Sequence, residues 1–203
     1  MSDPELLPIV DCGDPVLRQP AEPVDPADLR TPELQRLIVR MRATMEAAPG
    51  VGLAAPQVGV ALQLAVLQDG PERWGQLREE ERVARERNSL PFTVLVNPTL
   101  RPANGDDLVG FYEGCLSVPG ITAVVARHRA VRVQALDQYG QPVDEIFSGW
   151  AARIAQHEVD HLRGCLYLDR AETRSLSTGE NYTRRWAGRS PCDAAEALGF
   201  SLP

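Results

Sequence analysis

The amino-acid sequence predicts an α+β fold in which antiparallel β-sheets surround a central α-helix, with another helix near the N-terminus. Three observations support this prediction: a helical pattern over residues 148–164, a second over residues 31–48, and several strand-like segments between them. Helices that flank a run of strands, rather than alternating with them, are typical of α+β domains. The 203 residues suffice for one well-packed core. We therefore expect a single domain over residues 1–203, with residues 170–203 as a tail of uncertain structure.

The first helix follows an irregular, proline-rich stretch over residues 11–32. Thr31 is a suitable N-cap, and Pro32 suits the first helical turn, where a missing N–H removes no hydrogen bond. Pro49 and Gly50 should end the helix. Apolar side chains recur at helical spacing and predict one buried face, made by Leu34, Leu37, Ile38, Met41 and Met45.

Strand patterns dominate the middle of the chain. A glycine-rich turn, GVGLAAPQVGV, precedes the strand-like segment LQLAVLQD, and FTVLVNPTL is a second such segment. Residues 121–147 contain alternating strands with a turn at YGQP. Between the first two segments, residues 70–90 are densely charged, which predicts an exposed, solvated helix or excursion.

Composition excludes several classes of function. Hydrophobic residues make up 43% of the chain and charged residues 24%, as in ordinary globular proteins. All 21 basic residues are arginine, so Schiff-base lysines, P-loop lysines and Ser–Lys pairs are absent. The formal net charge of −7 argues against a DNA-binding surface.

The sequence also bounds the cellular compartment. The N-terminal stretch MSDPELLPIVDCGDP is acidic and lacks the apolar core of a signal peptide. No run of about 18 apolar residues predicts a membrane span. We expect a cytoplasmic protein with no membrane partner. In that compartment cysteines are thiols or ligands rather than disulfides, and the chain has four: Cys12, Cys115, Cys165 and Cys192.

The strongest chemical motif is HEVDH in the helix at residues 148–164. His157 and His161 are four residues apart, so their imidazoles share one helix face and can bind one metal ion. Glu158 can reach a water on that ion without binding the metal itself. Coordination lowers the pKa of such a water to roughly 7. Gly164 is placed to end the helix.

A catalytic metal of this kind usually has three protein ligands and an open position, and the motif alone leaves the third ligand undecided. A metzincin would have histidine where Tyr167 stands, so that pattern is excluded. A zinc endopeptidase could use Glu180, which lies 19 residues after His161. Cys115, in FYEGCLSVPG, is the other candidate. A purely structural metal site would leave Glu158 without a task and would need a fourth ligand.

Three segments resemble the signature motifs of peptide deformylases and occur in the family's order: GVGLAAPQVGV, EGCLSVPG and QHEVDHLRG. Together with GDPVLRQPA and TVLVNP, they cover most of the chain between residues 8 and 170. The segment SGWAARIAQHEVDHLRGCLYLD is most similar to the branch that includes organellar enzymes and bacterial relatives. Because no transit-like segment precedes the motifs, we expect a bacterial cytoplasmic enzyme.

The resemblance implies a ligand set and catalytic roles. Cys115, His157 and His161 match the metal ligands for one divalent ion per chain, expected to be Fe(II), with Zn, Ni or Co able to substitute. Glu158 matches the general acid and base. Gln57 and the backbone N–H of Leu116 match the donors that stabilise the oxyanion.

The implied reaction is hydrolysis of the formyl group of N-formyl-methionyl nascent peptides, with release of formate. A transient contact with the ribosome is also expected, and the chain should be a monomer or homodimer. Gly50 and Gly52 let a peptide approach closely, and an extended peptide can pair with Val51. Residues expected to contact substrate are Gly50, Val51, Gly52, Gly114, Trp150, Arg153 and Ile154. Glu113 should pair with Arg127 and stiffen the cysteine segment.

Overall fold

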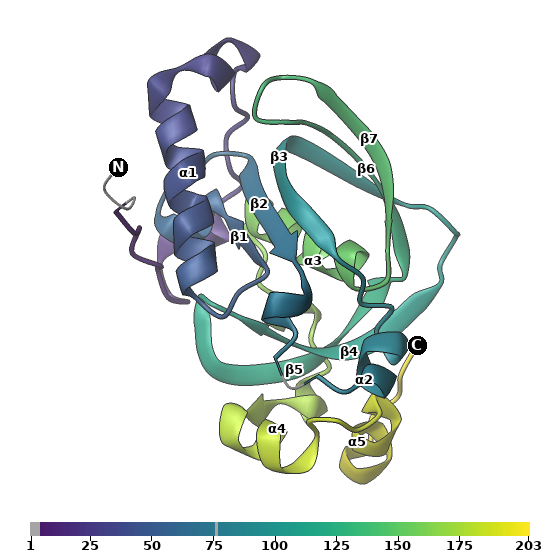
Figure 1. Ribbon diagram of the computed structural model, residues 1–203. Helices are drawn as coiled ribbons and strands as arrows, with labels where there is room; N and C mark the ends of the chain where they lie inside the picture. Colours follow the sequence, from purple (N-terminus) through teal and green to yellow (C-terminus); the bar gives the residue numbers. More distant parts are fainter. Residues whose placement is uncertain (1–4, 76) are drawn as a thin grey trace.

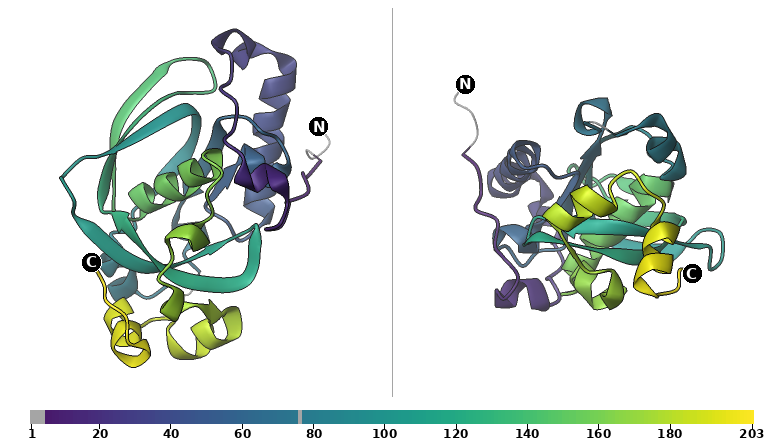
Figure 2. Two further views of the ribbon diagram at one scale, coloured as in Figure 1. Left: turned by 180° about the vertical axis from the view of Figure 1, so that it is seen from behind. Right: turned by 90° about the horizontal axis from the view of Figure 1, so that it is seen from below.

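Two antiparallel sheets lie on either side of one helix in the computed structural model, which describes residues 5–75 and 77–203 (Figure 1). The first four residues, part of the stretch in which we expect no signal peptide, lie outside the described residues. The central helix, α3 (Gly149–Leu162), contacts strands of both sheets and carries the HEVDH motif (Figure 2). The predicted α+β class is confirmed.

The larger sheet has five strands in the order β1-β2-β3-β6-β7, and the smaller has the order β4-β5-β8. Every pairing between neighbouring strands is antiparallel. Within the described residues, β1 therefore pairs only with β2, and β4 pairs only with β5, so each keeps one free edge. The strands span Gly52–Ala54 (β1), Leu64–Asp69 (β2), Leu90–Pro102 (β3), Leu108–Cys115 (β4), Val118–His128 (β5), Ala130–Leu136 (β6), Pro142–Ser148 (β7) and Ser177–Thr178 (β8).

The N-terminal helix α1 (Pro32–Ala47) forms as its sequence predicts. The Thr31 hydroxyl accepts a hydrogen bond from the backbone N–H of Leu34, which satisfies one free donor of the first turn. Its apolar face packs against β1 and β2, with Leu34, Ile38, Met41 and Met45 buried. No helix among the described residues is long and apolar enough to cross a membrane.

The end of α3 depends on Gly164. Its φ of +73° lies in the left-handed region, as expected for a residue that follows a helix. A Cβ at this position would lie 2.8 Å from the carbonyl carbon and oxygen of Arg18. Glycine is required here twice, for the backbone conformation and for the close approach of the N-terminal segment.

The charged segment at residues 70–90 differs in part from the prediction. It contains a short exposed helix, α2 (Glu79–Ala84), as expected. However, Arg87 is buried, and its guanidinium donates hydrogen bonds of 2.7 and 2.9 Å to the Asp69 carboxylate. The prediction of a wholly solvated segment is wrong at Arg87, because a buried carboxylate 18 residues earlier holds it inside.

Several elements lie outside the predicted pattern. The segment before Cys115 is itself a strand, β4, and the tail holds two further helices, α4 (Gly179–Arg185) and α5 (Pro191–Leu198). The tail packs on the smaller sheet through a cluster that includes Tyr112, Val124 and Ala194. The short 3-10 helices span Pro15–Arg18, Pro26–Arg30, Ala55–Val58, Pro71–Arg73, Tyr167–Arg170 and Thr173–Ser175, so the proline-rich and glycine-rich stretches are partly ordered into helical turns.

We expect Arg87→Met to lower the free energy of unfolding by about 3–5 kcal/mol, because it leaves Asp69 buried without its partner. Urea unfolding measures this change. Arg132→Met is the matched control, since it removes an equally bidentate pair with Asp144 that lies at the surface. Equal midpoints for the two variants would contradict a stabilising role for the buried pair.

Candidate metal centre

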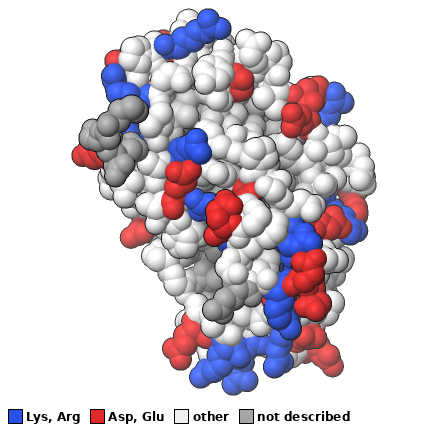
Figure 3. All heavy atoms as spheres, viewed as in Figure 1, with Lys and Arg blue, Asp and Glu red and all other residues white. Residues whose placement is uncertain are grey.

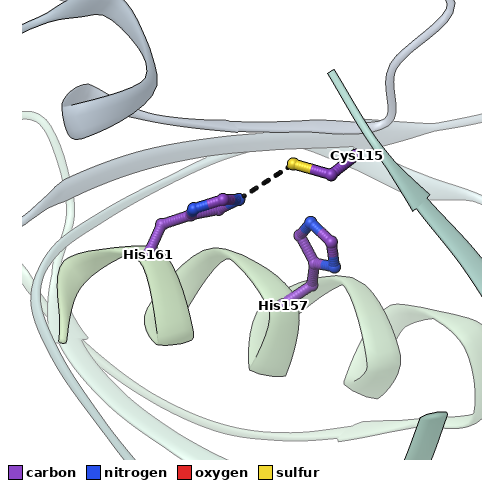
Figure 4. Close-up of side chains that lie close together, drawn as sticks. All are labelled: Cys115, His157 and His161. Carbon is purple, nitrogen blue, oxygen red and sulfur yellow. Dashed lines mark hydrogen bonds between the residues drawn. The ribbon is translucent and has the colours of Figure 1, made fainter. Parts of the chain in front are cut away.

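Three metal-donor side chains converge from two elements. The donor atoms of Cys115, His157 and His161 all lie within 4.8 Å of one another. Both histidines project from the same face of α3, and Cys115 approaches them from the end of β4 (Figure 4). The Cys115 Sγ lies 3.3 Å from the Nε2 of His161.

A tight hairpin positions the cysteine. Cys115 pairs with Val118 in the ladder between β4 and β5, so Leu116 and Ser117 alone make the turn. The Ser117 carbonyl accepts a 2.7 Å hydrogen bond from the backbone N–H of Cys12, which fastens the turn to the N-terminal segment. A two-residue connection leaves little freedom to the thiol that precedes it.

Glu113, two residues before the cysteine, orients the first histidine. The Nδ1 of His157 donates a 2.9 Å hydrogen bond to the Glu113 carboxylate, which leaves Nε2 as the metal-binding nitrogen. Arg127 donates two hydrogen bonds of 3.0 Å to the same carboxylate, and Arg153 donates a third of 2.6 Å. All of these side chains are buried or nearly so.

Asp160 extends this network and was missed from the sequence. Its carboxylate accepts a hydrogen bond from Arg127 and two more, of 2.8 and 2.9 Å, from Arg170. Asp160 lies three residues after His157 on the helix, a spacing that places it near the same face. This spacing from His157 was the feature of the sequence that could have identified Asp160. Tyr167 was also missed: its ring stacks on His157, with centroids 6.0 Å apart.

Burial and neighbouring charges set the protonation of the donors. Burial disfavours a charged His157, but its interactions with Cys115 and Glu113 raise its pKa well above the usual value. Burial, with the charge of His157, lowers the pKa of His161 well below the usual value. Burial also opposes a charged Glu113, yet Arg127 and His157 hold the pKa of that carboxyl far below its usual range.

Glu158 lies in the same cavity, with its side chain buried. Burial raises the pKa of Glu158 to about 7. Its Oε2 is buried without a hydrogen-bond partner among the described residues. A Cβ at Gly52 would lie 2.3 Å from the other carboxylate oxygen, so glycine is needed there to make room for Glu158.

Gln57 is held in one orientation beside the thiol. Its Oε1 accepts a 2.8 Å hydrogen bond from the backbone N–H of Ala54, which directs the amide N–H group the other way. The Nε2 lies 3.5 Å from Cys115 Sγ and 3.4 Å from Ser117 Oγ. Gln57 therefore presents a donor to the space that the three metal-donor residues enclose.

The predicted substrate-contacting residues gather around one cavity of about 350 Å³. Its lining includes Gly50, Val51, Gly52, Gln57, Gly114, Cys115, Leu116, Trp150, Arg153, Ile154, His157 and Glu158. Glu180, the ligand required by the endopeptidase alternative, is exposed on α4 and does not belong to the donor group. The endopeptidase interpretation therefore fails on its third ligand.

The donor set fits a divalent metal ion. One thiolate and two imidazoles suit zinc and iron, and three protein donors leave a position for a further ligand. Two further features are expected beside such an ion. The Nδ1 of His157 is held by a carboxylate, and the Glu158 carboxylate is buried with one oxygen unpartnered among the described residues. No competing group of three metal-donor residues occurs among residues 5–75 and 77–203.

We expect Arg127→Met to weaken metal binding by about 10- to 100-fold, because it removes the support of the Glu113–His157 hydrogen bond. Chelator competition measures the affinity. Arg170→Met is the matched control, since it also removes partners of Asp160 but does not touch Glu113. An equal loss of affinity in the two variants would refute the role of Arg127 in supporting the Glu113–His157 hydrogen bond.

Comparisons with known proteins agree with this site. Residues 6–176 match the family model described as polypeptide deformylase. Peptide deformylase 1 of Streptomyces coelicolor is 55% identical over 197 residues, covering 97% of this chain and 88% of the relative. The human mitochondrial peptide deformylase is 43% identical over 175 residues, covering 86% and 72%.

A solved structure is also similar. The Met-Ala-Ser-bound class I type b peptide deformylase from Acinetobacter baumannii has a TM-score of 0.72 and 33% identity, covering 82% of this chain and 99% of that one. The family-model match spans all three signature motifs, and the sequence identity extends over nearly the whole chain. The chain belongs to the peptide deformylase family.

Proposed function

We propose that Cys115, His157 and His161 hold one Fe(II) ion and that Glu158 transfers the proton as this enzyme removes the formyl group from N-formyl-methionyl nascent peptides. The observation that carries the proposal is the convergence of the three donors beside the buried, unpartnered Glu158 carboxylate. Zn, Ni or Co can occupy the same donor set. A bound divalent ion supplies Lewis-acid polarisation and lowers the pKa of water.

Glu158 acts first as a base and then as an acid. It takes a proton from the water that attacks the formyl carbon and delivers that proton to the leaving nitrogen, which releases formate and a free amino terminus. A pKa of about 7 suits both transfers near neutral pH. Gly52 supports this role, because any larger residue would displace the carboxylate.

Gln57 and the backbone N–H of Leu116 stabilise the negative charge that develops on the formyl oxygen. The hydrogen bond from Ala54 fixes the Gln57 amide before substrate arrives, so little reorganisation is needed. The two-residue turn likewise fixes the peptide unit of Leu116. Rigid donors of this type each contribute about 10²–10³ in rate.

The peptide backbone binds between the two free strand edges. Val51, just before β1, and Gly114, at the end of β4, line the cavity from opposite sheets and allow an extended chain to pair with either edge. Trp150, Arg153 and Ile154 wall the pocket for the methionine side chain. A transient ribosome contact, a monomeric or dimeric state and a bacterial cytoplasmic location stay predictions.

Formate release from formyl-Met-Ala-Ser tests the function. With anaerobically prepared protein, we expect Glu158→Gln to retain metal but lower kcat by about 10²–10⁴. Cys115→Ala should lose metal and activity, whereas the control Glu180→Ala should keep both. Retained metal and turnover in Cys115→Ala would overturn the assignment of the ligands.

Gly52→Ala should lower kcat about 100-fold, because the added Cβ moves the Glu158 carboxylate from its position. Steady-state kinetics and metal content measured together separate this effect from metal loss. Gly59→Ala is the control: its φ of +78° makes alanine strained, but a Cβ there contacts nothing within 4 Å. It should lose stability and keep kcat. Full activity in Gly52→Ala would show that the carboxylate tolerates displacement.

A further inference from the structure

A second cavity adjoins the metal pocket. It has a volume of about 530 Å³, against about 350 Å³ for the metal pocket, the cavity that Cys115, His157 and Glu158 line. Both cavities are lined by the same four residues at their junction: Arg85, Tyr112, Trp150 and Arg153. The two cavities therefore adjoin at these side chains, and a molecule that leaves the metal pocket here meets the second cavity.

The second cavity has three walls. Its floor is β4, the strand that runs on to Cys115, and one side is the segment around α2. The other side is the C-terminal tail, which lies beside α2 at the same end of the molecule (Figure 1). This tail lies beyond residues 6–176, which match the family model.

The tail wall is packed in place rather than loosely attached. The rings of Tyr112 on β4 and Tyr182 on α4 lie 5.1 Å apart. A Cβ at Gly110 would meet the Leu202 side chain at 2.7 Å, so β4 and the end of the chain are in close contact. Trp186 and Leu198 join the same apolar cluster. The cavity is thus a stable feature of the fold.

Arg85 stands at the junction of the two spaces. Its guanidinium lies 5.0 Å from the centre of the Trp150 ring and donates a long hydrogen bond of 3.5 Å to the Tyr182 hydroxyl. The nearest carboxylate oxygen, on Glu81, is 3.9 Å away. The Trp150 Nε1 and Tyr112 hydroxyl are buried without partners among the described residues. Buried polar groups normally have partners, so these two atoms are exceptions in the wall that separates the cavities.

The charge of the second cavity favours an acidic ligand. Its lining carries five arginines and three glutamates, in a chain whose net charge is −7. Glu81 and Glu86 pair with Arg78 and Arg129 of the same lining, and Arg153 pairs with Glu113. This leaves Arg85 and Arg189 against Glu80. Arg189 of the tail forms no ion pair among the described residues. Arginine side chains gather at the lower end of this face, where α4 and α5 lie (Figure 3). Opposite charge on a ligand would complement this lining.

We propose that the second cavity binds the residues that follow formyl-methionine in the nascent peptide, with a preference for acidic side chains that Arg85 sets. This inference rests on the proposed function, which fixes the formyl end of the peptide in the metal pocket. An extended chain advances about 3.3 Å per residue, so only peptides longer than a tripeptide extend far from the metal. Arg85 is a specificity-determining residue and takes no part in the proton transfer.

The test compares formyl-Met-Ala-Ser with two hexapeptides that continue it, one with glutamates and one with arginines at the fourth and fifth positions. In the wild type we expect a kcat/KM about tenfold higher for the acidic hexapeptide than for the basic one. Arg85→Met should reduce this ratio to near one, mainly through KM, and Arg85→Lys should restore part of it. Added salt should also reduce the ratio, because the attraction is electrostatic.

Arg82→Met is the matched control. Arg82 lies on α2, three residues before Arg85, but its guanidinium lies over the Trp74 ring and does not line the cavity. The acidic preference should persist in this variant, and circular dichroism should show all variants folded. Equal kcat/KM for the two hexapeptides in the wild type, or an equal ratio in Arg85→Met and Arg82→Met, would overturn the proposal.

A binding measurement separates this inference from the proposed function. Unformylated hexapeptides, titrated into metal-free protein and followed by tryptophan fluorescence, should bind more tightly when acidic, and Arg85→Met should lose that difference. Preserved binding preference without any formate release would defeat the proposed function alone. Formate release without a binding preference would defeat only the assignment of the cavity.

Discussion

The buried carboxylate of Glu113 is the interaction on which the site depends. It accepts hydrogen bonds from Arg127 on β5, Arg153 on α3 and His157 on α3, and thereby joins the smaller sheet to the central helix. Without this acid, Arg153 would be a buried charge with no acidic partner, at a cost of several kcal/mol, and Arg127 would keep only Asp160. The same carboxylate orients a metal donor, so the stability of the core and the geometry of the metal centre rely on one group.

The two sheets give the site its shape around that group. The larger sheet presents its edge at β1 and the smaller sheet its edge at β4, and α3 lies against both. The two sheets and the helix each contribute different residues to the site. Gln57 follows β1, Cys115 ends β4, and the two histidines and Glu158 come from α3. Segments far apart in sequence therefore meet only when both sheets have packed on the helix.

Local patterns were enough to predict the two long helices, the antiparallel class and the two histidines on one helix face, whereas Cys115 was predicted as their partner only through the resemblance to peptide deformylases. The N-cap at Thr31, the i, i+4 histidines and the terminal glycine act over one or two helical turns, so they can be recognised in sequence. The tail helices could not be predicted in this way. Their apolar residues form short runs, which are buried only because they pack against Tyr112 and Val124 of the smaller sheet. Arg87 was assigned to solvent for the same reason, since its partner Asp69 lies on another element.

The free edges at β1 and β4 have a consequence for which molecules can reach the metal. An open strand edge usually invites pairing with any other sheet, including that of a neighbouring molecule. Here residues at both edges, including Gly52 of β1 and Gly114 of β4, line the cavity beside the metal donors. A folded domain is too bulky to enter, whereas a flexible chain end can thread between them. The narrow space between the two edges thus selects for a flexible chain end before any side chain is recognised.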